Sequence, residues 1–86
     1  MPEKRKVEIF SAGCALCEEA IDIVERVVGP SDEVIVHDMT DPNIVQRAMS
    51  LRIRSVPAVV IDGKVLDTGR GVDEQTLRAA GLGRPD

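Results

Sequence analysis

The two cysteines of the chain stand two residues apart, at a junction between two kinds of secondary-structure pattern. An apolar, largely β-branched run over residues 6–10 precedes them, and a helical apolar period follows from Ala15 to Val28. Cys14 therefore falls where a helix begins, with Cys17 one turn later on the same side. Unpaired backbone N–H groups and the positive end of the helix dipole stabilise a thiolate at such a place. This junction predicts a strand–loop–helix corner that carries a reactive thiol pair.

A thiol pair at this spacing is suited to disulfide exchange. Cys14 would attack a substrate disulfide, and Cys17 would then resolve the mixed disulfide without a second protein. Because Cys17 lies nearer the apolar stripe of the helix, we expect burial to raise the pKa of its thiol. The alternative is a pair of buried, inert thiols. A lone, closely spaced pair in a loop favours redox or metal chemistry over that alternative.

The middle of the chain continues the alternation of strand and helix. Residues 33–37 form the second predicted strand, and its continuous apolar stretch before the only histidine suits a parallel strand covered on both faces. Asp41 and Pro42 then supply an N-cap and a first-turn proline for a second helix that continues to Leu51. A strand, a helix and another strand form a βαβ unit with a right-handed crossover.

The last third of the chain predicts a hairpin and a helix. Residues 56–61 and 64–67 form strands that turn at Asp62-Gly63, a strong hairpin signal. A final helix is capped by Asp73 and ends at Gly81. The order β-α-β-α-β-β-α predicts an α/β fold with a four-stranded mixed sheet and helices on both faces.

Length and composition restrict the classes of function. The chain has 86 residues, so we expect one domain over 1–86. Its only aromatic residue is Phe10 and its net charge is −4, which disfavours nucleic-acid partners. Residues 1–6 are charged and lead into a short apolar run, unlike a signal peptide or a membrane span. We therefore expect a cytoplasmic protein without a membrane partner, where a lone cysteine pair is reactive or metal-binding rather than structural.

Two motifs in this order of elements resemble the thioredoxin superfamily in its short, glutaredoxin-like form. One is Cys14-Ala15-Leu16-Cys17 after the first strand, and the other is the segment 51–60, which looks like the family's approach to its cis-proline. The resemblance covers residues 7–82 and implies a three-layer sandwich with thiol–disulfide oxidoreductase activity. Ala15-Leu16 departs from the Gly-Pro and Pro-Tyr pairs of that family, and Gly13 replaces the exposed tryptophan of thioredoxins.

The resemblance implies substrate-binding residues as well. A cis bond before Pro57 would place the backbone of Val56 beside the cysteines, where it pairs with a bound peptide or glutathione. Gly69 and Gly71, which precede Asp73, fall where glutaredoxins hold the γ-glutamyl end of glutathione. A plain turn followed by a helix N-cap accounts for the same three residues.

Glu8 and His37 are ionisable residues of the first two predicted strands. Glu8 falls six residues before Cys14, where thioredoxins place a buried acid that relays a proton to the second thiol. Burial would raise the pKa of such a carboxyl, which suits the relay. The alternative for Glu8 is a strand-end carboxylate that reaches water. For His37 we expect a surface position at a strand end rather than a ligand role.

Two functions from different classes remain. The first is a dithiol oxidoreductase of electron transport and redox homeostasis, which reduces protein or glutathione-linked disulfides. It would act as a monomer without a bound cofactor, with glutathione as one candidate reductant and a reductase to recharge the pair. The second is a soft-metal carrier, since two thiolates suit Cu(I), Zn²⁺ or Hg²⁺. That fold needs a hairpin after the second strand, whereas a helical pattern follows Asp41-Pro42, and two thiols leave a zinc site short of four ligands. We therefore assign no metal ligands.

Overall fold

Strands and helices alternate along the chain as the sequence predicts. A computed structural model describes residues 5–30, 32–53, 55–68, 74–79 and 81–82. The elements are β1 (Arg5–Ser11), α1 (Ala15–Val27), β2 (Asp32–Asp38), α2 (Pro42–Ser50), β3 (Ala58–Ile61), β4 (Lys64–Thr68) and α3 (Glu74–Ala79).

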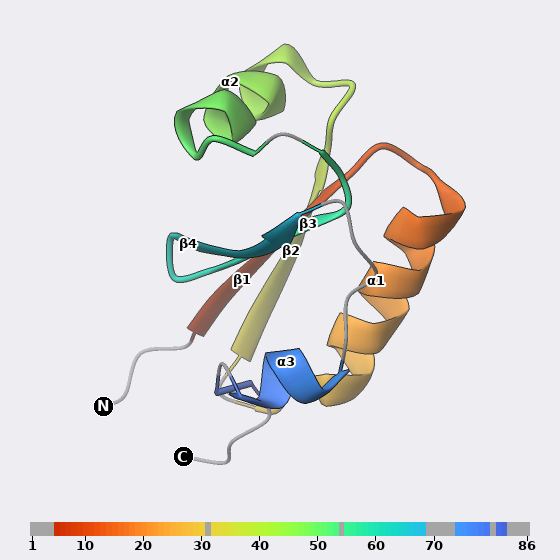
Figure 1. Cartoon of the computed structure of the whole chain (residues 1–86), viewed down its shortest axis with the longest axis vertical. Helices are drawn as coiled ribbons and strands as arrows, with labels where there is room; N and C mark the ends of the chain where they lie inside the picture. Colours follow the sequence, from red (N-terminus) through yellow and green to blue (C-terminus); the bar gives the residue numbers. More distant parts are fainter. Residues whose placement is uncertain (1–4, 31, 54, 69–73, 80, 83–86) are drawn as a thin grey trace.

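The strands of the described residues form one mixed sheet in the order β2-β1-β3-β4. β1 pairs with β2 in parallel and with β3 antiparallel, and β3 pairs with β4 antiparallel. This arrangement, with β1 and β3 inside and β2 and β4 at the edges, confirms the predicted α/β fold class (Figure 1). The hairpin between β3 and β4 turns at Asp62 and Gly63, whose φ angles are 50° and 84°. Two successive positive φ values are typical of the type I′ turn that Asp-Gly favours.

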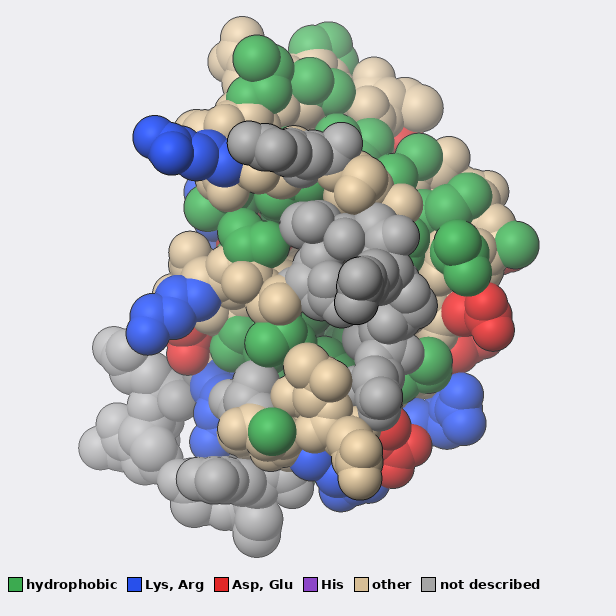
Figure 2. All heavy atoms as spheres, viewed as in Figure 1, with side chains coloured by type: hydrophobic (Ala, Val, Ile, Leu, Met, Phe, Trp, Pro, Cys, Tyr) green, Lys and Arg blue, Asp and Glu red, His purple; other side chains and the backbone are tan. Residues whose placement is uncertain are grey.

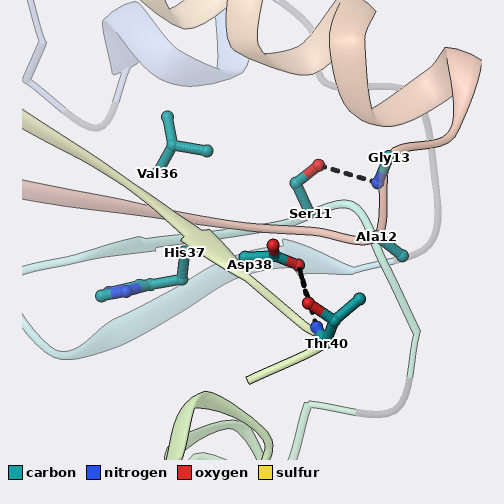
Figure 3. A pocket seen from close by; sticks show the side chains of 7 residues that line it. All are labelled: Ser11, Ala12, Gly13, Val36, His37, Asp38 and Thr40. Atoms are coloured by element: carbon teal, nitrogen blue, oxygen red, sulfur yellow. Dashed lines mark hydrogen bonds between the residues drawn. The ribbon is translucent and has the colours of Figure 1, made fainter.

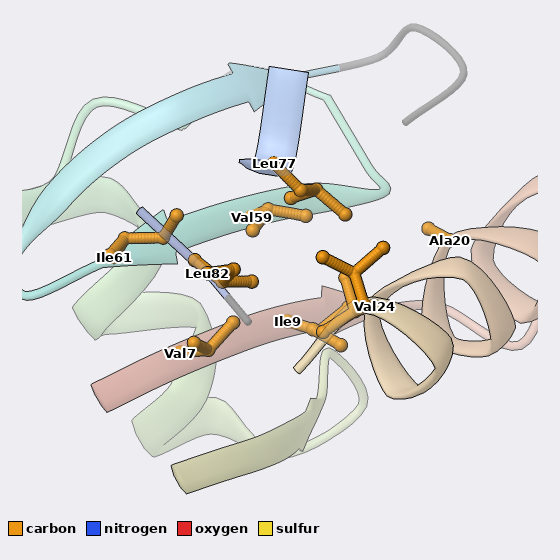
Figure 4. Packing of buried hydrophobic residues seen from close by; sticks show 9 residues of the cluster. Val7, Ile9, Ala20, Val24, Val59, Ile61, Leu77 and Leu82 are labelled. Atoms are coloured by element: carbon orange, nitrogen blue, oxygen red, sulfur yellow. The ribbon is translucent and has the colours of Figure 1, made fainter. Parts of the chain in front are cut away.

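Helices cover the two faces of the sheet unequally. α1 and α3 pack on one face, where α1·α3 and α1·β1 contacts join a cluster of aliphatic side chains (Figures 1 and 4). α2 covers the other face, over a smaller cluster centred on Phe10. The larger cluster comprises Val7, Ile9, Ala20, Val24, Val27, Val59, Ile61, Leu77 and Leu82.

β1 contributes to both clusters because its side chains alternate between the two faces. Val7 and Ile9 point toward α1 and α3, whereas Phe10 points toward α2. All three side chains are fully buried. The chain leaves this strand at Ser11, so the cysteine loop follows directly from five consecutive buried residues.

The second helix begins as its sequence predicts. Asp41 is the N-cap of α2 and accepts a hydrogen bond from the Asn43 N–H at 2.9 Å, and Pro42 occupies the first turn. A helix at this point, rather than a hairpin strand, is the feature that separates this fold from the soft-metal carriers. No helix in the described part of the chain combines the length and the apolar run that crossing a bilayer requires.

Candidate functional site

Cys14 is the N-cap residue of α1. Its backbone is extended, with φ −89° and ψ 165°, and its Sγ accepts a hydrogen bond from the Cys17 N–H at 3.2 Å. The sulfur thus occupies the position that a serine or aspartate oxygen takes in an ordinary cap. The Cys14 side chain is also exposed to solvent. A thiolate at this residue gains a charge-assisted hydrogen bond and the helix dipole while a substrate can still reach it.

Gly13 makes the turn that brings Cys14 to the helix. Its φ is +78°, a conformation that glycine adopts without the steric cost of a Cβ atom. Its N–H donates to the Ser11 Oγ at 3.2 Å (Figure 3). A Cβ atom added at Gly13 would meet no atom within 4 Å. The glycine is therefore required by the backbone dihedral rather than by lack of space.

Cys17 is fully buried, and its sulfur accepts several hydrogen bonds. The Ala12 N–H donates to its Sγ at 3.5 Å, and the Cys14 thiol and the Ser11 hydroxyl also hydrogen-bond to it. Burial by itself raises the pKa of Cys17, but the hydrogen bonds from Cys14, Ala12 and Ser11 together outweigh burial and lower it. Our expectation of a raised pKa at Cys17 was therefore wrong. That expectation considered burial alone and left out the hydrogen-bond donors in the preceding loop.

The segment Val56-Pro57 lies at the same end of the sheet as the cysteine loop. In the register of β1 and β3, Phe10 pairs with Ala58, so the residues that precede Ala58 lie across from the residues that follow Phe10. The Val56–Pro57 peptide bond is cis, as the resemblance implied, and Pro57 is buried. Contact between the Val56 backbone and a substrate stays a prediction.

The environment of Glu8 differs from the one that the relay prediction assumes, and the relay role itself stays a prediction. Its side chain is only 2% exposed and points toward α2, as its contacts with Arg47 show, whereas Cys17 belongs to α1 on the opposite face. Arg47 donates to both carboxylate oxygens, at 2.8 and 2.7 Å, and His37 Nε2 lies 2.9 Å from Oε1. The hydrogen bonds from Arg47 outweigh burial and lower the pKa of Glu8 to about 2. The expected raised pKa and the exposed strand-end alternative are both wrong.

The sequence analysis missed the cluster Glu8, His37 and Arg47 on the α2 face. His37 is not a simple surface residue, because its ring also lies 4.9 Å from the ring of Phe10. One signal was available, since an acid within an apolar strand that is covered on both faces needs a cationic partner. The identity of the partner depends on how α2 packs, which no local pattern encodes.

Three of the predicted binding residues, Gly69, Gly71 and Asp73, lie outside the described residues. Both cysteines are free thiols. Within the described ranges, no group of three or more His, Cys, Asp or Glu side chains is arranged to hold a metal ion. The site as described therefore consists of two thiols, the loop that donates hydrogen bonds to them, and the adjacent cis-proline segment.

Comparison with known proteins agrees with this geometry. A family model described as a thioredoxin domain matches residues 5–80, and the chain belongs to that family. A protein of Acidithiobacillus ferrooxidans, described as an uncharacterized 9.0 kDa protein in the mobE 3′ region, is 50% identical over 80 residues. That match covers 91% of this chain and 94% of the relative.

Two solved structures resemble the fold. A dimeric thioredoxin-like protein of Nitrosomonas europea is 32% identical, with a TM-score of 0.65 over 84% of this chain and 95% of that one. A malarial protein is 18% identical, with a TM-score of 0.65 over 90% of this chain and 92% of its own. The second likeness concerns the fold alone. The chain is thus a thioredoxin-like domain with a C-x-x-C pair at the start of its first helix.

Proposed function

We propose that this protein is a thiol–disulfide oxidoreductase in which Cys14 attacks and Cys17 resolves. The Cys14 thiolate displaces one sulfur of a substrate disulfide as a thiolate and forms a mixed disulfide with the other. The Cys17 thiolate then attacks Cys14 Sγ and releases the second substrate thiolate. The substrate disulfide gains two electrons, the two cysteines lose them, and the released thiolates take up protons from water.

One observation carries this division of roles. Cys14 is exposed while Cys17 is completely buried, and the two thiols are in hydrogen-bond contact. A substrate disulfide can reach only the sulfur of Cys14, and the sulfur of Cys17 lies within reach of the mixed disulfide that results. Hydrogen bonds from Ala12 and Ser11 lower the pKa of Cys17 without needing the Cys14 thiol, and so favour its thiolate in the second step.

The remaining parts of the proposal concern partners. We place a disulfide-containing peptide or glutathione along the Val56-Pro57 backbone, because that segment and the cysteine loop lie at the same end of the sheet. The reaction itself requires no cofactor in the protein, and a cytoplasmic reductase or glutathione would return the pair to the dithiol. In a reducing compartment the pair would rest in the form that attacks.

We also propose that the protein acts as a monomer. Cys14, Cys17 and the Val56-Pro57 segment all belong to one chain, so the site needs no second copy. The similar Nitrosomonas protein is described as dimeric, which makes a dimer the competing state. Sedimentation equilibrium over a hundredfold range of concentration distinguishes the two, since a dimer would show a mass that rises with concentration.

Turnover with two electron donors tests the proposed activity. The protein is supplied with a model disulfide protein and either thioredoxin reductase with NADPH or glutathione with glutathione reductase. We expect turnover with one donor, and its loss in Cys14→Ser. Failure with both donors, combined with tight binding of Cu(I) by the thiol pair, would favour the soft-metal carrier instead.

A further inference from the structure

A cavity of about 410 Å³ lies beside the cysteine loop, at the carboxyl ends of the parallel strands β1 and β2. Its lining from β1 and the loop after it comprises Ser11, Ala12 and Gly13, and its lining from β2 and the turn after it comprises Val36, His37, Asp38 and Thr40 (Figure 3). Crevices at the carboxyl ends of parallel strands are common ligand sites in α/β proteins. The proposed disulfide exchange uses none of the four residues from β2 and the turn after it.

The chemistry of the lining indicates a cationic occupant with an aliphatic stem. Val36 is 48% exposed and supplies an apolar wall. Asp38 supplies a carboxylate, which is fixed in place by the Thr40 N–H and hydroxyl, at 2.9 and 2.8 Å from Oδ1. Those hydrogen bonds lower the pKa of Asp38, so its carboxylate is ionised at neutral pH. Among the described residues, no other donor contacts the Asp38 carboxylate.

The helix that follows the cysteine loop is negatively charged, as the Asp38 carboxylate is. α1, which begins at the loop, exposes four acidic side chains along its length, and acidic groups are visible over this helix in Figure 2. The chain as a whole carries a net charge of −4. Such a surface attracts cationic partners and repels anionic ones. The four acidic residues are Glu18, Glu19, Asp22 and Glu25.

The sheet order sets the separation between the cavity and the Val56-Pro57 segment. β1 lies between β2 and β3, so the cavity and the Val56-Pro57 segment flank the cysteine loop on opposite sides. Adjacent strands are about 4.8 Å apart, which puts β2 roughly 10 Å from β3. An extended peptide advances about 3.3–3.6 Å per residue, so about three residues of a bound peptide span this width.

We propose that this cavity binds a lysine or arginine side chain of the substrate, two or three residues from the substrate cysteine that Cys14 attacks. The side chain's methylene groups would lie on Val36 and its cationic end would pair with Asp38. This inference rests on the proposed disulfide exchange and adds the substrate class to it. Asp38 is then a specificity residue and takes no part in the electron transfer.

Peptides that differ in one charge test the inference. Each peptide carries one cysteine as a mixed disulfide with 5-thio-2-nitrobenzoate, and lysine, norleucine or glutamate stands two or three residues away. Attack by Cys14 on the peptide sulfur releases thionitrobenzoate, and the rate constant of that release is measured. We expect the lysine peptide to react about fivefold faster than the norleucine peptide, the upper range for an exposed ion pair. High salt should reduce the difference.

Two variants assign the preference to the cavity. Asp38→Asn keeps an oxygen that can accept from Thr40 but removes the charge, so the preference for lysine should disappear. Glu25→Gln makes the same change of charge on an exposed side chain of α1. Glu25 lies about 16 Å from Cys14 along the helix axis, at 1.5 Å per residue, so this variant should keep the preference. The rate with the norleucine peptide is the reference for each variant, so the preference is always the ratio of the lysine rate to the norleucine rate.

The outcomes separate this inference from the proposed function. Equal rates for all three peptides, or a preference that survives Asp38→Asn, would overturn the cavity assignment and leave the exchange reaction standing. Loss of preference in Glu25→Gln as large as in Asp38→Asn would also overturn it, in favour of a general field. No release from any peptide by the unaltered protein would overturn both.

Discussion

Cys14 and Cys17 differ in surroundings although only two residues separate them. Cys14 occupies the N-cap and faces solvent, while Cys17 faces the loop between β1 and α1 and receives hydrogen bonds from Ala12 and Ser11. The contrast follows from geometry, because one turn of helix is enough to move a side chain from the surface to the interior. A single loop therefore provides one sulfur for the substrate and another for the resolving step.

Ser11 should control the titration of Cys17. We expect Ser11→Ala to raise the pKa of Cys17, because it removes a hydroxyl that hydrogen-bonds to the buried sulfur. Thiolate would then form at higher pH, which thiolate absorbance near 240 nm against pH would show. Ser50→Ala is the matched control, since that hydroxyl donates to the Arg47 carbonyl at the end of α2. An unchanged titration in Ser11→Ala would contradict this role.

Gly13 should contribute to stability through its backbone alone. Gly13→Ala places a Cβ in a left-handed conformation, at a cost of about 1–2 kcal/mol, although the Cβ itself has open space. Urea unfolding of the reduced protein measures the loss. A variant as stable as the parent would mean that the loop adopts another conformation at no cost.

At the scale of elements, Glu8, Arg47 and His37 join β1, α2 and β2 on the α2 face. Arg47 makes a two-pronged contact with the Glu8 carboxylate, so the ion pair fixes the position of the helix as well as the charge. A buried carboxylate that loses such a partner is strongly destabilising, because its charge is left without compensation. This cluster thus ties the second helix to the central strand.

The ion pair predicts a loss of stability in acid. The pKa of Glu8 is about 2 in the folded protein against 4.5 ordinarily, so its contribution is complete above about pH 4.5 and is lost as the pH falls toward 2. The shift corresponds to about 3 kcal/mol. Free energies of unfolding measured from pH 7 to pH 2 would show this decline.

Arg47→Met provides the matching variant for the acid series. It should unfold more easily than the parent at pH 7 and show a shallower loss of stability toward pH 2, because the pKa of Glu8 is no longer held down by the guanidinium. Arg26→Met changes an exposed arginine in the last turn of α1 and serves as control. An acid slope in Arg47→Met as steep as in the parent would contradict the assignment.

Local signals were enough to predict the elements, and interactions between elements were not predictable. The Asp62-Gly63 turn, the Asp41-Pro42 start of α2 and the cysteine junction each have a short-range physical cause, and each lies where the sequence predicts. The partners of Glu8 come from a strand and a helix 29 and 39 residues away. The donors to Cys17 lie only three to six residues away, yet they are brought to its sulfur by the turn at Gly13.

At the scale of the whole molecule, two small clusters on either side of one sheet hold the domain together. The α2 face depends on Phe10, the only aromatic residue of the chain, packed with Ala48, Ala58 and Val60. A domain of this size has a free energy of unfolding of roughly 4–13 kcal/mol. Loss of a single large side chain is therefore a sizeable part of the total.

Phe10→Ala should bring the protein close to unfolding. Truncation of a buried phenylalanine costs about 3–5 kcal/mol, which lowers the melting temperature by at least about 10 °C in a domain of this size. Met49→Ala, at a side chain that is 69% exposed, should leave the melting temperature nearly unchanged. Equal melting temperatures for Phe10→Ala and the parent would mean that the α2 face is held by other contacts.

The mass of a trapped intermediate tests the central claim most directly. Cys17→Ser, mixed with a disulfide peptide, should accumulate a covalent complex of protein and one peptide half, joined through Cys14. Cys14→Ser should accumulate none, because Cys17 is fully buried. A complex formed through Cys17 in Cys14→Ser, at a rate equal to that of the Cys17→Ser variant, would contradict the assignment of Cys14 as the attacking thiol.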